Sequence, residues 1–497
     1  MQQLLISEWN NLFGNKPAVD FLQNILLEYL PTCRWFGGKS RAIQNIEIHK
    51  QVRVETQDYC TYCCIVQCNY DDGLYEWYSL PITITNDETL PNILQLESLF
   101  LVDALQMETF RKIIYSSIFS NSKIHEISGS KSKQTVLDEP QNVQSKILKV
   151  EQSNTSIIYN NKYFFKWFRK IDLGINPDLE TIKYLTEKTT FKNIPLYVGH
   201  VTWAFNNDEA LLGMMQNAVP NNGDAWVYIC DELKSSYKNL LVDSTKSEIN
   251  LSTYFIEKIS LLGKRTAELH NALCNENDDE FMPEKFDINY QNWILECIEK
   301  LIDAKFNLLQ ENLYKLTLET KTKADKVLEA KQKLINYFKT KLETPLQANK
   351  IRIHGDYHLG QVLYSNNDFV ILDFEGEPDK PHAMRRIKYT SLRDVAGMLR
   401  SFHYATYAVL YQNFNEKEQQ QLTDFAINWY NKVYKIYLDS YIQNANEIAL
   451  PQNSTTEILL QLYIAEKAIY EMGYEINNRP AWLNIPLQNL FELVSSL

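Results

Sequence analysis

Apolar positions in the N-terminal part of the chain change from a helical spacing to an alternating one. Residues 8–30 repeat apolar side chains at helical intervals. From Ile46 to Leu101 apolar and polar residues alternate, and the turn Asp71-Asp72-Gly73 separates two of the alternating segments. This pattern predicts a small domain made of a helix and an antiparallel sheet, followed by a helix over Leu101–Ser120 and a polar linker over Asn121–Asp138.

A second group of alternating segments begins near Ile147 and precedes a long helical part. A polar turn is predicted at residues 152–156. The strands predicted in this part are Ile157–Tyr159, Tyr163–Phe168 and Leu211–Gln216. Beyond Asp224 the apolar spacing is almost wholly helical. The chain is therefore expected to contain a sheet-rich lobe followed by a helical lobe.

One predicted hairpin interrupts the helical part. Apolar runs at Val362–Tyr364 and Phe369–Leu372 flank the turn Asn366-Asn367-Asp368. Asp356 stands shortly before this hairpin, and Asp373 follows it directly. The pattern therefore places one carboxylate on each side of a short strand pair.

The spacing of polar residues around this hairpin fits phosphoryl transfer. Gln361 stands five positions after Asp356, and Asp373 opens the triplet Asp373-Phe374-Glu375. In kinase-like catalytic loops the first Asp is the base, and an amide five positions later and an Asp on the next strand hold metal. A lone His-Gly-Asp is more often a simple turn, but the joint occurrence favours catalysis. We predict Asp356 as the catalytic base and Gln361 and Asp373 as Mg²⁺ ligands.

Lys166 has the surroundings of a nucleotide-binding residue. It stands in an otherwise apolar strand, where an unpaired charge would be costly, and Glu180 opens the next predicted helix. A strand Lys paired with a helix Glu holds phosphates in kinases. The sequence has no Gly-x-Gly-x-x-Gly loop, but the side chains of Ser153, Asn154 and Thr155 could bind phosphate instead. An exposed Lys on an edge strand stays open as the alternative.

The predicted helix Glu457–Tyr474 carries a polar and aromatic stripe. Lys467, Tyr470, Glu471 and Tyr474 lie on one face of this helix by their spacing. Aromatic rings pack on the faces of sugar rings, and charged groups bind hydroxyls. We therefore predict Lys467, Tyr470 and Tyr474 as substrate-binding residues for a sugar, and core packing of the tyrosines stays open as the alternative.

Several longer strings resemble those of one kinase family. They are RWFGGKSR, RIHGDYHLGQVL, DFVILDFEGEP, SLRDVAGMLRS and EKAIYEMGYEINNRPAWLNIPL. These strings closely resemble the bacterial maltokinases, in the aminoglycoside-phosphotransferase-like branch of the eukaryotic-like kinase superfamily. The resemblance implies an α+β, bilobal protein-kinase-like fold. It implies a helix-plus-antiparallel-sheet cap domain at residues 1–130, a nucleotide-binding lobe at 131–222 and a mainly helical C-lobe at 223–497.

The resemblance also implies an activity. It indicates an ATP-dependent kinase that uses Mg²⁺ to phosphorylate the anomeric hydroxyl of maltose, giving maltose 1-phosphate and ADP for glycogen synthesis, in association with a separate trehalose synthase chain. Adenine would be held near Gln216 and Ala218, at a hinge between the lobes, and Asp394 would brace the catalytic loop. A kinase of a related sugar such as glucosamine, and a non-catalytic pseudokinase scaffold, stay open.

Composition restricts the partners. A chain of 497 residues is long enough for more than one domain. Its formal net charge of -12 disfavours nucleic acid and anionic membranes, which both select clustered Lys and Arg. Without a signal-peptide pattern or a long apolar window, we expect a cytoplasmic protein. The cluster Cys60, Cys63, Cys64 and Cys68 lacks the spacing of zinc knuckles and is expected to be strand thiols.

Overall fold

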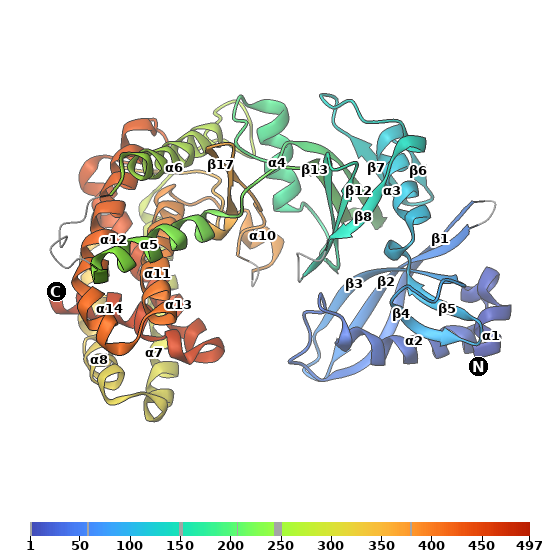
Figure 1. Ribbon diagram of the computed structural model, residues 1–497, viewed down its shortest axis with the longest axis horizontal. Helices are drawn as coiled ribbons and strands as arrows, with labels where there is room; N and C mark the ends of the chain where they lie inside the picture. Colours follow the sequence, from blue (N-terminus) through green and yellow to red (C-terminus); the bar gives the residue numbers. More distant parts are fainter. Residues whose placement is uncertain (1, 57–58, 149–152, 206, 243–250, 378–379) are drawn as a thin grey trace. The chain divides into compact units, whose positions relative to one another are not determined.

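The structure is a computed structural model that describes the chain except for residues 1, 57–58, 149–152, 206, 243–250 and 378–379. It forms two compact units (Figure 1). The first unit contains residues 1–188 and 195–219, and the second contains 189–194 and 220–497. This division lies close to the boundary predicted after residue 222. The boundary predicted at residue 130 falls inside the first unit and stays a prediction.

The N-terminal sheet of the first unit follows the alternating pattern of its sequence. Its strands pair in the order β1-β2-β3-β5-β4, and all neighbours are antiparallel. The bounds are β1 Ile43–Thr56, β2 Tyr59–Tyr70, β3 Tyr75–Thr85, β4 Asn92–Leu96 and β5 Leu99–Asp103. Helix α2 (Lys16–Tyr29) buries Leu22 and Leu26 against this sheet (Figure 1). The clustered cysteines are free thiols of β2, and three of them are buried.

Two segments differ from their predicted structure. Leu101 belongs to strand β5, and the helix that follows, α3, runs only over Glu108–Ser120. The predicted linker contains strands β6 (Lys123–Ile124) and β7 (Ile127–Lys131). Because β7 gains its hydrogen-bonding partner from the distant strand β12, no local pattern could show that it would be a strand.

The second sheet of the first unit has the order β6-β7-β12-β13-β10-β9-β8. The bounds of its other strands are β8 Ser145–Leu148, β9 Asn154–Tyr159, β10 Tyr163–Phe168, β12 Tyr197–Phe205 and β13 Asp208–Asn217. Asn154 and Thr155 therefore begin a strand, whereas the sequence predicted a turn. Residue 152 of that predicted turn lies outside the described residues. Helix α4 (Pro177–Lys188) connects β11 (Lys170–Ile171) to this sheet.

A buried arginine joins the two sheets. Arg169 is 2% exposed, and its guanidinium forms an ion pair with the carboxylate of Asp103 at the end of β5. The Arg169 Nε–H donates to Thr155 Oγ1 at 2.9 Å. Its backbone carbonyl accepts from the Ser79 N–H at 2.7 Å, and the following strand β11 pairs with β3. The Arg169 side chain thus attaches the start of β9 to the N-terminal sheet.

The second unit is mainly helical. Its longer helices are α5 Ala225–Val242, α6 Thr253–Ala272, α7 Ile288–Asn312, α8 Leu318–Glu329, α9 Lys331–Lys341, α11 Leu392–Asn413, α12 Glu416–Asn444, α13 Asn453–Asn478 and α14 Asn484–Ser496. Helix α11 is buried on all sides over most of its length and contacts α5, α12 and α13 (Figure 1). A helix that is buried on all sides belongs to a core, so α11 is the centre of this unit.

The predicted hairpin is present in the second unit. Strand β16 (Val362–Ser365) pairs antiparallel with β17 (Asp368–Ile371), and Asn366 and Asn367 adopt the positive φ that a tight turn requires. The hairpin contacts helices α5 and α6. These contacts hold the residues on either side of the hairpin against the helical core.

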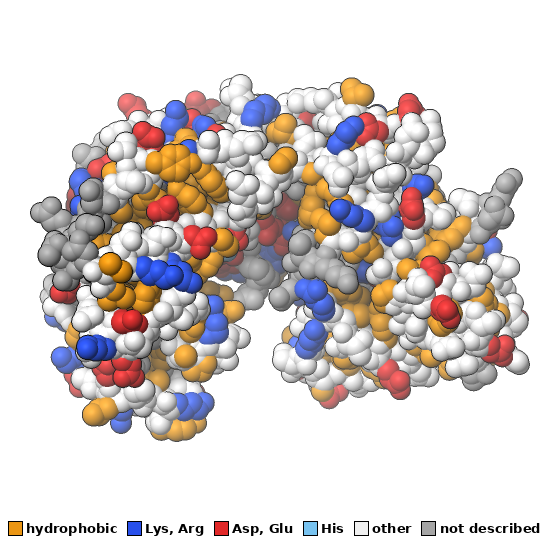
Figure 2. All heavy atoms as spheres, in the orientation of Figure 1, with side chains coloured by type: hydrophobic (Ala, Val, Ile, Leu, Met, Phe, Trp, Pro, Cys, Tyr) orange, Lys and Arg blue, Asp and Glu red, His pale blue; other side chains and the backbone are white. Residues whose placement is uncertain are grey.

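The surface carries charges of both signs. On the face shown in Figure 2, Lys and Arg side chains are interspersed with Asp and Glu. In the part of the chain that the structure describes, every helix is too short or too polar to cross a membrane.

Candidate active site

The loop before the hairpin is fixed by a buried carboxylate. Asp394, in the first turn of α11, accepts hydrogen bonds from the backbone N–H groups of His354 at 2.7 Å and Gly355 at 2.9 Å. The oxygen that accepts from His354, Oδ2, also contacts His270 Nε2 at 3.1 Å. The predicted bracing role of Asp394 is therefore confirmed by its contacts, which fix the backbone next to Asp356.

The electrostatics of Asp394 suit this role. Burial would raise its pKa, but the hydrogen bond and charge of His270 and the N–H of Gly355 outweigh burial, so the pKa lies below its ordinary range. Gly355 has a φ of 89°, a left-handed conformation that L side chains rarely adopt. The loop therefore needs an ionised carboxylate beneath it and a glycine within it.

Asp356 faces a lysine from another helix. Its Oδ1 lies 3.3 Å from Lys467 Nζ of α13, and its Oδ2 lies 3.9 Å from His358 Nε2. Burial would lower the pKa of Lys467, but the carboxylates of Asp356 and Glu471 outweigh burial and raise it, so Lys467 stays protonated. Burial lowers the pKa of His358, so this imidazole is neutral at neutral pH. Lys467, predicted as a sugar ligand, thus also contacts the predicted base.

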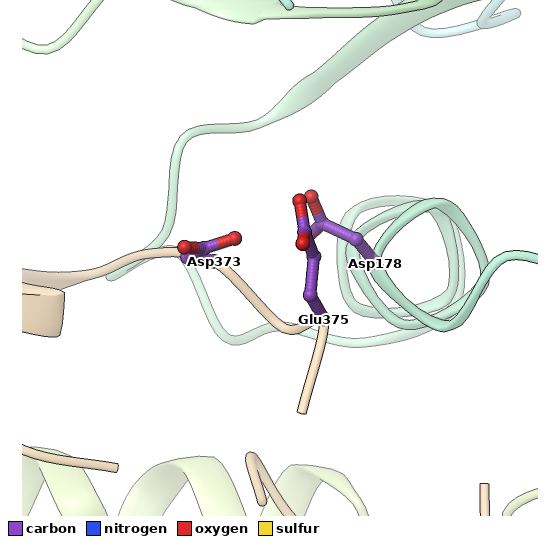
Figure 3. Close-up of side chains that lie close together, drawn as sticks. All are labelled: Asp178, Asp373 and Glu375. Carbon is purple, nitrogen blue, oxygen red and sulfur yellow. The ribbon is translucent and has the colours of Figure 1, made fainter. Parts of the chain in front are cut away.

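Asp373 and Gln361 are in direct contact. Gln361, at the end of a short 3-10 helix (η6, Leu359–Gln361), donates its Nε2–H to Asp373 Oδ2 at 3.2 Å. Asp373 follows β17 with a φ of 62°, and Glu375 follows on the same loop (Figure 3). Carboxylate and amide oxygens are the donors that Mg²⁺ prefers, so the chemistry of these side chains fits the predicted metal.

In the first unit, Lys166 has an acidic partner on α4. Its Nζ lies 4.0 Å from the carboxylate of Asp178, which is buried in the first turn of that helix. Figure 3 shows Asp178 on this helix. The sequence suggested Glu180, two positions later, and a nucleotide-binding role for Glu180 stays a prediction.

The other predicted nucleotide ligands lie at the ends of the second sheet. Ser153 is exposed just before β9, while the Thr155 hydroxyl accepts from Arg169. Gln216 is half-buried at the end of β13, and the Ala218 N–H donates to the Lys162 carbonyl at 2.7 Å. Together with Asn154, these residues stay predicted ligands.

A cavity of about 290 Å³ lies beside the Asp356 loop in the second unit. Its walls come from the loop, from α7, from the start of α11 and from α13. They include Trp293, Cys297, Gly355, Tyr357, Glu377, Tyr389, Arg393, Tyr463, Glu466, Lys467 and Tyr470. Tyr474 is not among the lining residues; it is 45% exposed, and the Arg479 guanidinium lies over its ring. The structure therefore brings two of the three predicted sugar ligands to the cavity.

The charged side chains of the wall pair with one another. The Arg393 guanidinium lies 3.0 Å from Glu377 Oε1 and 3.1 Å from Glu466 Oε1. Lys380 Nζ lies 2.6 Å from Glu377 Oε2. The sequence did not reveal this cluster. Glu377, Arg393 and Glu466 stand in three separate recognised strings, and no string shows that these three side chains meet.

Known proteins resemble different parts of the chain. Residues 29–101 match the family described as the maltokinase N-terminal cap domain. The glucosamine kinase of Mycolicibacterium smegmatis is 23% identical over 339 residues, which cover 68% of this chain and 76% of that protein. The glucosamine kinase of Streptacidiphilus jiangxiensis is 21% identical over 347 residues, covering 69% of this chain and 72% of that protein.

Solved structures show the fold. A glucosamine kinase in complex with glucosamine, ADP and inorganic phosphate has a TM-score of 0.64 and 14% identity, covering 91% of this chain and 94% of that one. A second crystal form of glucosamine kinase has a TM-score of 0.66 with 14% identity, covering 95% and 99%. Residues 29–101 therefore match a maltokinase N-terminal cap domain, and the chain has the α+β fold of the solved glucosamine kinases.

Proposed function

We propose that this protein is an ATP-dependent sugar kinase that phosphorylates the anomeric hydroxyl of maltose, giving maltose 1-phosphate and ADP. The observation that carries the proposal is the setting of Asp356. Its loop is fixed by Asp394, its carboxylate faces Lys467 at 3.3 Å, and Gly355 and Lys467 both line an adjacent cavity. A fixed carboxylate next to a cavity is what deprotonation of a bound hydroxyl requires.

The proposed reaction uses Asp356 as general base. Asp356 accepts the proton of the anomeric hydroxyl while that oxygen forms a bond to the γ-phosphorus of ATP. The bond between this phosphorus and the oxygen that bridges the β- and γ-phosphates breaks, and ADP leaves with that oxygen. The Lys467 ammonium, 3.3 Å from Asp356 Oδ1, holds the Asp356 carboxylate in place before the transfer.

Gln361 and Asp373 are the residues that would hold Mg²⁺. When bound, the metal neutralises the charge between the β- and γ-phosphate oxygens. The hydrogen bond from the Gln361 Nε2 to Asp373 orients both side chains, and it leaves the amide oxygen of Gln361 available as a donor to a cation.

Lys166 and the start of β9 are the proposed phosphate contacts of the first unit. Lys166 carries the charge for the α- and β-phosphates, and Asp178 holds its side chain in place. Ser153, Asn154 and Thr155 would add polar contacts. Because the Ala218 N–H already donates to Lys162, an adenine base next to Gln216 would use other backbone groups. One solved glucosamine kinase of this fold is described with ADP, which supports a nucleotide.

The charges of the cavity wall favour a neutral sugar over glucosamine. Glu377 is paired with Lys380 and Arg393, and Glu466 is paired with Arg393. A cationic amino sugar would have to displace one of these cations to gain a carboxylate, whereas a neutral sugar would not. The match to the maltokinase cap domain supports the same choice. Glucosamine stays the second candidate, because the relatives that cover more of the chain are named glucosamine kinases.

A coupled assay of ADP release tests this function. The protein is mixed with ATP, Mg²⁺ and either maltose, glucose or glucosamine, and kcat/KM is compared. We expect maltose to give the highest kcat/KM. A higher kcat/KM for glucosamine than for maltose would contradict the choice of maltose. Absence of ADP release with all three sugars would contradict the proposed sugar-kinase activity.

A further inference from the structure

The side chain of Tyr463 is unusual within the cavity wall. It lies on α13, is 2% exposed and lines the cavity, yet its hydroxyl has no hydrogen-bond partner among the described residues. The hydroxyl of Thr390 is fully buried and close enough to contact the Tyr463 hydroxyl, but neither oxygen makes a well-formed hydrogen bond to a described residue. Two adjacent buried hydroxyl groups beside the cavity therefore lack well-formed hydrogen bonds.

Such hydroxyl groups lower the stability of the folded state. A buried polar group without a partner destabilises the fold, and natural structures contain few of them. Phenylalanine would fill the same space without this penalty. Tyr357, another tyrosine of the same wall, shows the usual solution, because its hydroxyl lies 2.9 Å from the Thr266 hydroxyl. The Tyr463 hydroxyl thus calls for a partner that the described residues do not supply.

The surroundings of Tyr463 indicate what kind of partner fits. The nearby charges of Arg393 and Glu466 are engaged with each other at 3.1 Å. Burial raises the pKa of Tyr463, so the phenol stays neutral and can both donate and accept a hydrogen bond. A sugar hydroxyl is the matching group, since it also donates and accepts without charge.

We propose that Tyr463 is a substrate-binding residue whose hydroxyl, next to that of Thr390, exchanges a hydrogen bond with one hydroxyl group of the bound sugar. The inference rests on the proposed function to the extent that the cavity holds a sugar. It adds a hydrogen bond that selects one particular hydroxyl group of the sugar. The paired charges of the wall and the ring of Tyr470 would not make that selection.

The test compares two substitutions of matched chemistry. Tyr463→Phe removes the hydroxyl and keeps the ring of this cavity-lining residue. Tyr228→Phe removes another buried hydroxyl that has no partner among the described residues, on α5, whose side chain does not line the cavity. We expect neither variant to lower the thermal unfolding midpoint of the sugar-free protein. We expect Tyr463→Phe to lower kcat/KM for maltose by about 10- to 100-fold, and Tyr228→Phe to leave it unchanged.

Monodeoxy analogues of maltose complete the test. For the analogue that lacks the hydroxyl bound by Tyr463, the wild type should have a lower kcat/KM than for maltose. Tyr463→Phe should have the same kcat/KM as the wild type for this analogue. Equal kcat/KM for wild type and Tyr463→Phe would overturn the inference, as would a Tyr463→Phe variant that loses thermal stability and is penalised alike on every analogue. If the wild type accepts only glucosamine, the choice of maltose fails, and the same comparison with deoxy-glucosamines decides whether Tyr463 binds a sugar hydroxyl.

Discussion

Two buried polar regions of this protein differ in how completely they are satisfied. In the first unit, the guanidinium of Arg169 is engaged by Asp103 and Thr155. In the second unit, the hydroxyls of Tyr463 and Thr390 are equally buried but have no partner among the described residues. A satisfied buried network needs nothing further and serves the fold, whereas leftover polar atoms beside a cavity point to a ligand. We therefore expect Arg169 and its partners to stabilise the fold, and Tyr463 to bind a substrate.

The largest effect is expected from Asp356→Asn. The amide keeps the shape of the side chain but cannot accept the hydroxyl proton, so kcat should fall by about 10² to 10⁴-fold. The thermal unfolding midpoint should stay close to that of the wild type, because Asp356 is proposed to act on the substrate and not to stabilise the fold. Steady-state ADP release and a thermal melt measure both quantities. A variant that keeps more than half of the wild-type kcat would remove Asp356 from the chemistry.

Asp103→Ala should have the opposite signature. It leaves the buried Arg169 guanidinium without its carboxylate, which typically destabilises a protein by about 3–5 kcal/mol. The control is Asp72→Ala, which removes an exposed partner of Arg41 and should leave the stability almost unchanged. Urea unfolding of both variants gives these differences. Equal stability of the two variants would show that burial of the Arg169 pair does not matter.

The pH dependence of stability offers a further contrast. Burial in β12 lowers the pKa of His200 to about 4, against about 6.5 for an unfolded histidine. Between these two pKa values the folded state therefore binds fewer protons at His200 than the unfolded state does. The free energy of unfolding is at its full value above pH 6.5 and decreases as the pH falls toward 4. Between pH 7.5 and 5.0 the loss should be about 2 kcal/mol.

His200→Gln provides the matched comparison. This variant has no imidazole to protonate at position 200, so its urea unfolding midpoint should change less between pH 7.5 and 5.0 than that of the wild type. A wild type and variant with the same pH dependence would show that His200 is not kept neutral by the fold.

The smallest effects concern the two outer tyrosines of α13. Tyr470 lines the cavity, so Tyr470→Ala should weaken maltose binding by about 1–3 kcal/mol. Tyr474 lies outside that wall, and Tyr474→Ala should change binding by no more than about 0.5 kcal/mol. Calorimetric titration with maltose distinguishes them. Equal losses for both variants would extend the sugar site along the helix to Tyr474.

The sequence predicted the fold where its signals are local. The turn at Asn366-Asn367-Asp368, the flanking apolar runs and the bracing Asp394 were all found, because turn residues and motif spacing are properties of neighbouring positions. Strand β7 was missed because its partner β12 is remote in sequence.

The candidate site was predictable only in part. Asp356, Gln361 and Asp373 follow a spacing that the chemistry demands, so a motif could identify them. The cavity wall has no such spacing: Glu377, Arg393 and Glu466 meet only after three segments fold together. Tyr463 was invisible for a further reason. In sequence it is one of many tyrosines, and its missing hydrogen bond can be recognised only in the folded structure.

The position of the phosphate in the product tests the central claim most directly. Maltose is incubated with ATP, Mg²⁺ and the wild-type protein, and the product is examined by ³¹P and ¹H NMR. If Asp356 deprotonates the anomeric hydroxyl, the phosphorus should couple to the anomeric proton and the reducing end should be lost. A product that keeps its reducing end, with phosphate on another hydroxyl, would contradict the account.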